Sequence, residues 1–206
     1  MGWAERSANN LTIVDWQERY LSGDTPWDKG ASAPSIQPLI EEKPELFSGH
    51  RVFVPGCGIG HDAKELAKYG LNVVGGDIAP LAIARAKEEN PHQVDFRELN
   101  ILTIPESLVG NFDMVWEHTC FCALDPTLRA DYVAAMWKLL KPSGVVLGVF
   151  FTNPDVIPNE GPPYKTSCEE LREIFSSHFS LEWVDEPKAF YQGREGREHL
   201  MLFKRL

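Results

Sequence analysis

Three glycines and one carboxylate within residues 51–77 have the spacing of a nucleoside-binding turn. Gly56, Gly58 and Gly60 stand at alternate positions directly after the apolar stretch 52–54, and Asp77 ends a second apolar stretch. Glycine lets the backbone approach a ligand that a Cβ atom would exclude. An acidic residue about 20 positions after the first glycine can accept hydrogen bonds from ribose hydroxyls. These residues predict a strand, glycine turn, helix and strand that bind a nucleoside.

The glycine spacing also discriminates between ligands. The dinucleotide fingerprint requires its third glycine at position 61, where this chain has His61. A pyrophosphate cradle is therefore disfavoured, and a nucleoside without phosphates is favoured. A tight strand-to-helix turn with no ligand is the plainer alternative; the flanking strand and the position of Asp77 count against it.

The elements that must position these residues alternate along the chain. Strands alternating with helices require a parallel sheet with right-handed crossovers. The last two strands have no clear helix between them, so they predict an antiparallel hairpin. The result is an α/β fold with helices on both faces of a seven-stranded, mostly parallel sheet whose last strand is antiparallel. This Rossmann-like pattern is typical of class I methyltransferases. The predicted strands are 52–54, 72–76, 94–99, 112–116, 144–151, 181–184 and 199–203, and the predicted helices after the first strand begin near 61, 81, 128 and 167.

In such a sheet the ligand lies beyond the carboxyl ends of the strands. Gly56, Asp77, Asn100 and the pair Glu117–His118 all fall at the ends of the first four predicted strands. We expect these residues to converge on one site.

Two further segments could cover that site. Residues 1–30 contain a helical pattern over 11–22, with Trp16, Tyr20 and Trp27 close together in sequence, and predict an aromatic arm over the ligand. The alternative is an ordinary amphipathic helix docked on the core. Residues 153–164 form a loop rich in proline, and loops of this length in compact domains are often functional.

Composition limits the class of protein. The chain has 206 residues, which suits a single domain spanning 1–206, and its net charge of −10 argues against broad nucleic-acid binding. No apolar run of about 18 residues predicts a membrane span. The four cysteines lack paired C-x-x-C spacing, so we expect no metal site, no disulfide scaffold and a cytoplasmic location. No obligatory protein partner is evident.

Six motifs in order carry a resemblance that covers nearly the whole chain. They are TPWDKG at 25–30, VPGCGIGHD at 54–62, GDI at 76–78, FCALDP at 121–126, LLKPSG at 139–144 and GPPYK at 161–165. The sequence resembles the S-adenosylmethionine-dependent methyltransferases of the thiopurine methyltransferase-like superfamily. It is most similar to plant halide/thiocyanate (thiol) methyltransferases and their bacterial relatives, which also read V-P-G-C-G at the first turn.

The resemblance implies S-adenosyl-L-methionine as cofactor. Two positions depart from the family pattern: Tyr20 replaces a tryptophan, and Asn100 replaces a frequent aspartate beside the adenine. The pair Glu117–His118 replaces an Asp–Tyr pair of the plant enzymes, so no catalytic role is carried over to it from the family. The predicted cofactor-binding residues are Trp16, Tyr20, Trp27, Gly56, Gly58, Asp77, Asn100, Ile101 and His118.

The implied reaction is in-line methyl transfer to a small soft nucleophile, namely a thiol, a halide or thiocyanate. Trp27 and Tyr164 would wall the methyl group, and His118 could accept a thiol proton, so Tyr164 and His118 are the catalytic candidates. Binding the cofactor or stabilising a strand end is an equal alternative for His118. Other acceptors (a metalloid, an oxygen or a nitrogen) and a non-catalytic sensor of the cofactor remain open, whereas a dinucleotide-dependent oxidoreductase is disfavoured.

Overall fold

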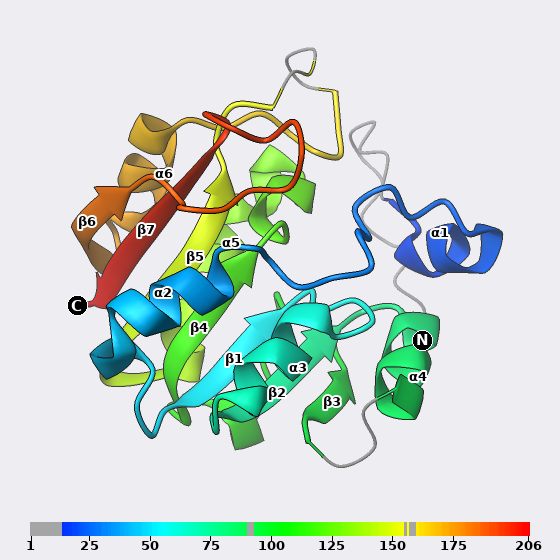
Figure 1. The fold of residues 1–206 in the computed structure, drawn as a ribbon, viewed down its shortest axis with the longest axis horizontal. Helices are drawn as coiled ribbons and strands as arrows, with labels where there is room; N and C mark the ends of the chain where they lie inside the picture. The colour runs from blue at the N-terminus through cyan, green and yellow to red at the C-terminus, as the bar shows by residue number, and fades with distance from the viewer. Residues whose placement is uncertain (1–13, 90–92, 155, 157–159) are drawn as a thin grey trace.

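A computed structural model describes residues 14–89, 93–154, 156 and 160–206. Within these residues the chain forms one seven-stranded sheet, shown in Figure 1, in the order β3-β2-β1-β4-β5-β7-β6. The strands are β1 Arg51–Pro55, β2 Asn72–Asp77, β3 Asp95–Glu98, β4 Phe112–His118, β5 Leu140–Phe151, β6 Phe179–Asp185 and β7 Glu198–Arg205.

The pairing of the strands confirms the predicted topology. β1 pairs in parallel with β2 and with β4, β2 with β3, and β4 with β5. β7 is antiparallel to both β5 and β6, as the predicted final hairpin requires. Chain order reverses between β1 and β4, and a ligand site is expected outside the carboxyl ends of the strands at that point.

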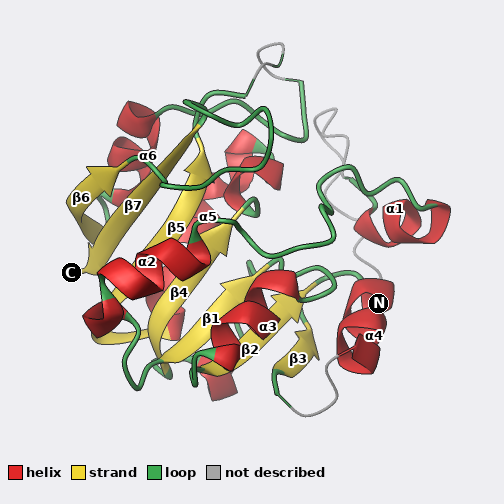
Figure 2. Ribbon diagram, viewed as in Figure 1, coloured by secondary structure: helices red, strands yellow, loops and turns green. Residues whose placement is uncertain are grey.

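Helices cover both faces of the sheet, as Figure 2 shows, which confirms the predicted layers. One buried cluster joins β-strand side chains to α2 and α3, and the other joins them to α5 and α6. The α-helices are α1 Trp16–Ser22, α2 Ile36–Glu42, α3 His61–Lys68, α4 Pro80–Glu89, α5 Arg129–Leu139 and α6 Cys168–Phe175, with 3-10 turns η1 Pro44–Leu46, η2 Glu106–Leu108, η3 Phe121–Ala123 and η4 Pro126–Leu128.

The middle parts of the central strands are apolar because their side chains alternate between two buried layers. On β1, Val52 and Val54 enter the cluster under α2 and α3, whereas Phe53 enters the cluster under α5 and α6. On β4, Met114 and Val115 divide in the same way. Burial on both faces is the usual state of a parallel sheet that helices cover on either side.

Several element boundaries differ from the prediction. β5 begins at Leu140, so residues 141–143 extend the strand, with a shift of register where β4 pairs with it. α6 ends at Phe175, and β6 spans Phe179–Asp185, so it begins two residues earlier than the predicted strand 181–184. Residues 11–13 of the predicted arm helix, and 155 and 157–159 of the predicted loop, lie outside the described residues. Among the helices described, none is long and apolar enough to cross a membrane.

Candidate active site

The turn between β1 and α3 brings its backbone close to other parts of the chain. Gly56 and Gly58 both have φ +55, a left-handed conformation that L side chains rarely adopt. A Cβ atom on Gly56 would lie 2.8 Å from Cys120 Sγ, and one on Gly58 would lie 2.9 Å from Tyr20 Oη. Both positions therefore require glycine for space as well as for backbone conformation.

Asp77, the last residue of β2, is bonded to this turn. Its Oδ2 accepts a hydrogen bond from Gly58 N at 2.9 Å, and its Oδ1 accepts one from Ala79 N at 2.9 Å. The side chain is 7% exposed, and burial raises the pKa of its carboxyl against the lowering effect of the backbone donors. Each carboxylate oxygen can accept a further hydrogen bond, so the group can still receive a ligand hydroxyl.

The three aromatic residues of the predicted arm gather over the same turn. Trp27 Nε1 donates to Tyr20 Oη at 3.4 Å, and the rings of Trp16 and Trp27 are 5.2 Å apart between centroids. Gln17 fixes α1 beside α4, because its Oε1 accepts from Leu81 N at 2.9 Å. In Figure 1, α1 lies beyond the carboxyl ends of β1 and β2, alongside α4. The structure thus brings the arm, the glycine turn and Asp77 together.

The residues after β3 have local contacts of their own. Asn100 Oδ1 accepts from Leu102 N at 2.9 Å and so shapes the turn that follows the strand. Ile101 is 9% exposed and packs in the buried cluster under α5 and α6. A cofactor contact by either residue stays a prediction.

The end of β4 is fixed by Glu117. Its Oε1 accepts from Cys120 N at 2.9 Å and from Phe121 N at 2.8 Å, and its Oε2 accepts from Tyr132 Oη. The residue is buried, and burial raises the pKa of its carboxyl. Through these contacts Glu117 stabilises the loop that follows β4.

Tyr164 is bonded to the same loop. Its backbone N donates to Cys122 O at 2.6 Å, and its side chain is 8% exposed. The structure therefore places the backbone of Tyr164 against the loop that follows β4, and a role of its side chain in walling the methyl group stays a prediction.

His118 is held by a carboxylate that sequence reasoning did not select. His118 Nδ1 lies 2.9 Å from Oδ2 of Asp62, in the first turn of α3, and the two side chains are each 11% exposed. The imidazole stacks on the ring of Tyr191, with centroids 6.0 Å apart. Asp62 lies inside the VPGCGIGHD motif, which is the signal that could have identified it.

Residues 28–33, which begin at the end of the aromatic arm just after Trp27, connect these groups. Asp28 Oδ1 lies 3.0 Å from His61 Nε2, the backbone O of Ala31 accepts from Tyr191 Oη at 2.6 Å, and Ala33 N donates to Asp62 Oδ1 at 2.7 Å. We call this stretch the bridging segment. It joins the arm to both the glycine turn and the surroundings of His118.

Comparison with known proteins decides the family. The model of the thiopurine S-methyltransferase family matches residues 11–204. The chain belongs to this family. This family member is 31% identical over 198 residues to thiocyanate methyltransferase 1 of Arabidopsis thaliana, covering 93% of this chain and 84% of that protein. It is also 34% identical over 164 residues to the probable thiol methyltransferase 2 of the same plant, covering 77% of this chain and 70% of that protein.

Solved structures show the same fold for the family member. It superposes on Burkholderia thailandensis 1,6-didemethyltoxoflavin-N1-methyltransferase, crystallised with S-adenosylhomocysteine, with a TM-score of 0.70 at 19% identity, covering 91% of this chain and 84% of that chain. A S-adenosylmethionine-dependent methyltransferase from Methanosarcina mazei gives a TM-score of 0.66 at 18% identity, covering 85% and 99%. The fold predicted from the sequence is thus confirmed.

The chain is therefore a methyltransferase that depends on S-adenosylmethionine. Its residues fit that cofactor, because a turn that only glycine can form lies beside a buried carboxylate and three aromatic rings. Aromatic faces attract a cation such as a sulfonium by about 0.5–2 kcal/mol each.

Replacing Gly58 by alanine should weaken binding of S-adenosylhomocysteine by about tenfold or more, because the added methyl meets Tyr20 Oη and strains the turn. Calorimetry measures the change. Gly70→Ala is the matched control, since Gly70 has φ +83 and nothing within 4 Å of its missing Cβ. Equal loss of affinity in both variants would mean that backbone strain alone is responsible.

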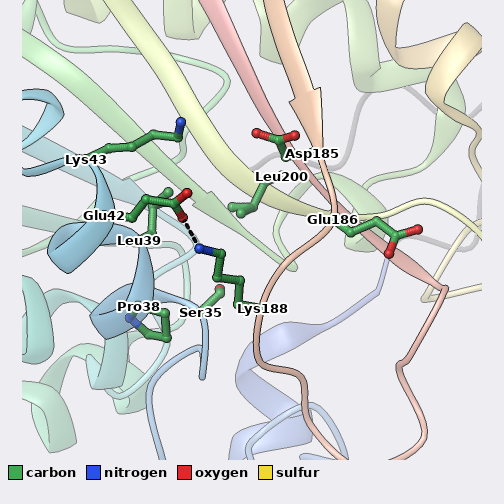
Figure 3. A pocket seen from close by; sticks show the side chains of 9 residues that line it. All are labelled: Ser35, Pro38, Leu39, Glu42, Lys43, Asp185, Glu186, Lys188 and Leu200. Carbon is green, nitrogen blue, oxygen red and sulfur yellow. Dashed lines mark ion pairs between the residues drawn. The ribbon is translucent and has the colours of Figure 1, made fainter.

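A cavity of about 140 Å³ lies away from these residues, between α2 and the β6–β7 side of the sheet. Figure 3 shows that charged side chains surround it, with Glu42 paired to Lys188 at 2.7 Å. None of its lining residues belongs to the predicted site. We therefore do not assign the methyl-transfer site to this cavity.

Proposed function

We propose that this methyltransferase acts on a small soft nucleophile: a thiol, a halide or thiocyanate. The observation that carries the proposal is the convergence of the glycine turn, Asp77 and the aromatic arm at one edge of the sheet, in a chain whose relatives include proteins named thiocyanate methyltransferase and probable thiol methyltransferase. A soft anion needs no general base, and a thiol with a pKa of about 8.5 is already partly ionised at neutral pH.

The residues of the proposed site have different expected roles in binding the cofactor and in methyl transfer. When bound, S-adenosylmethionine supplies a methyl group activated by a sulfonium. Gly56 and Gly58 would give its methionine portion room at the turn, and Asp77 would accept hydrogen bonds from its ribose. Asn100 and Ile101 would lie beside the adenine. Trp16, Tyr20, Trp27 and Tyr164 would cover the reacting groups and exclude water, which favours displacement at a cationic centre.

The cysteines near the site are not candidates for covalent catalysis. Cys120 and Cys122 are buried, and burial raises the pKa of the Cys120 thiol well above its ordinary value and that of Cys122 to about 12. Both thiols are therefore neutral packing groups. All four cysteines are free, which supports our proposal of a reducing, cytoplasmic location.

An acceptor screen tests the proposal. Purified protein is incubated with methyl-labelled S-adenosylmethionine and, separately, with small thiols, iodide, bromide, chloride and thiocyanate. Arsenite, a phenol and a primary amine represent the other acceptor classes. We expect volatile or small methylated products from the first group only. Transfer confined to the second group would overturn the acceptor class, and tight binding of S-adenosylhomocysteine with no transfer to any acceptor would favour a sensor.

A further inference from the structure

Asp62 holds His118 in one orientation. The two oxygens of Asp62 accept three hydrogen bonds: from Ala33 N at 2.7 Å, from Trp116 Nε1 at 2.8 Å and from His118 Nδ1 at 2.9 Å. Burial would raise the pKa of the Asp62 carboxyl, but His118 and the other donors lower it, so the group is ionised. An ionised carboxylate can only accept, and His118 Nδ1 must therefore carry a hydrogen atom.

The other ring nitrogen of His118 has no partner within the described part of the chain. Nε2 is buried and makes no hydrogen bond to any described residue. A buried polar atom without a partner is rare and costs free energy of about 1–3 kcal/mol, so it requires an explanation. Because Nδ1 is bound to Asp62, Nε2 offers a lone pair when the ring is neutral and an N–H donor when it is protonated.

Charged groups from several elements face His118. Besides Asp62 on α3, they are Glu117 on β4, Glu198 on β7 and Arg194 in the segment before β7. Arg194 pairs with Glu198 at 2.7 Å and lies over the ring of Phe151, so most of its charge is compensated. Tyr191, whose ring stacks on the imidazole, keeps its proton because burial raises its pKa.

Asp62 favours the protonated form of His118. Burial lowers the pKa of His118, but Asp62, together with a smaller contribution from Glu198, more than offsets this, and the pKa lies above its ordinary value of about 6.5. Raising the pH through that pKa converts the protonated ring to the neutral one.

We propose that Nε2 of His118 is the atom that binds the methyl acceptor and that Asp62 is its positioning residue; this rests on the proposed function. With a thiol, neutral His118 accepts the proton: the S–H bond breaks, its electron pair stays on sulfur, and the proton moves to Nε2. The thiolate then lies beside an imidazolium. With thiocyanate or a halide there is no proton to accept, and protonated His118 donates its Nε2–H to the anion.

The two classes of acceptor should show opposite pH dependences in the natural chain. Transfer to a thiol requires neutral His118, so its kcat/KM should rise as pH increases through the pKa of His118. Binding of thiocyanate requires protonated His118, so kcat/KM for thiocyanate should fall as pH increases through the same pKa. Parallel pH profiles for the two acceptors would overturn the proposal.

Two variants separate the roles of the pair. In His118→Gln, thiocyanate transfer should lose its pH dependence, with KM raised about tenfold or more, and thiol transfer should follow the free thiol, rising near its pKa of about 8.5. In Asp62→Asn, the thiocyanate profile should persist but move to lower pH, because the charge that favours protonation is gone. His178→Gln, beyond α6, and Asp131→Asn, exposed on α5, are the matched controls and should leave both profiles unchanged.

Binding measurements keep the test independent of turnover. Thermal unfolding shows whether His118→Gln is folded. Calorimetry with S-adenosylhomocysteine then separates the acceptor role from the cofactor contact that the sequence predicted for His118: the proposal expects the affinity to be retained, and a large loss would assign His118 to the cofactor and overturn the proposal. Thiocyanate titrated into that complex should bind the natural chain more tightly at low pH and bind His118→Gln about tenfold more weakly there. If the natural chain methylates no thiol, halide or thiocyanate, the proposed function fails. The role of His118 is then tested by the thiocyanate-binding measurement alone. Equal binding by the natural chain and His118→Gln overturns the inference.

Discussion

Replacing Asp77 by alanine is expected to weaken binding of S-adenosylhomocysteine by roughly 10- to 150-fold. This corresponds to about 1.5–3 kcal/mol, the scale of a hydrogen bond to a charged group. The variant loses the carboxylate that would bind the ribose, and it also removes the acceptors of Gly58 N and Ala79 N. Isothermal calorimetry gives the affinity, and thermal unfolding shows how much of the change belongs to the fold.

Two companion variants sharpen this test. Asp77→Asn keeps one oxygen for a backbone donor but removes the charge. We therefore expect its affinity for S-adenosylhomocysteine to lie between that of the natural chain and that of the alanine variant. Asp95→Ala, exposed on the neighbouring strand β3, removes a carboxylate that lies outside the proposed site and should leave affinity unchanged. Unaltered affinity in Asp77→Ala would exclude Asp77 from cofactor binding.

Deleting residues 1–22 should leave a folded protein with turnover reduced by roughly a hundredfold, the scale on which small misplacements of reacting groups act. The sheet begins at Arg51, and within the described part of the deleted segment Gln17 bonds to Leu81 while Tyr20 packs against α4 and the glycine turn. The deletion removes Trp16 and Tyr20 and frees Trp27 from both, so the site is open to water. Circular dichroism checks the fold, and the labelled-methyl assay checks the rate.

Limited proteolysis examines the same arm without relying on the acceptor. If the arm closes over the cofactor, it should be cut readily in the absence of ligand and be protected by S-adenosylhomocysteine. Tyr20→Ala should reduce that protection, because the ring that covers Gly58 is gone. Equal cleavage with and without ligand would mean that Trp16 and Tyr20 are ordinary packing residues.

The sequence predicted the sheet well because the signals that begin and end its strands are local. Apolar runs such as 52–54 and 144–151 are buried on both faces, and glycine or proline ends most of them. The start of β5 was missed because Pro142 indicates the end of a helix, yet here it lies within a strand whose pairing with β4 is irregular. Whether a proline lacking N–H fits a strand depends on the neighbouring strand, which a single sequence does not reveal.

The site was predictable where topology alone places residues. Parallel strands end at one edge of the sheet, so Gly56, Asp77 and His118 could be grouped without knowing any side-chain contact. The pairing of Asp62 with His118 could not be predicted, because the two are 56 residues apart in sequence. Moreover, an acidic residue in the first turn of a helix is usually explained by the helix dipole, which hides a second role.

The bridging segment has a consequence for the order of events at the site. Residues 28–33 contact His61 beside the glycine turn, Asp62 behind His118 and Tyr191 over its ring. A shift of the arm that changes the first contact therefore acts on the other two. Binding of the cofactor and binding of the acceptor are then thermodynamically linked. If the cofactor raises the affinity for the acceptor by some factor, the acceptor raises the affinity for the cofactor by the same factor. We therefore expect calorimetry to show that thiocyanate binds more tightly to the complex with S-adenosylhomocysteine than to the protein alone.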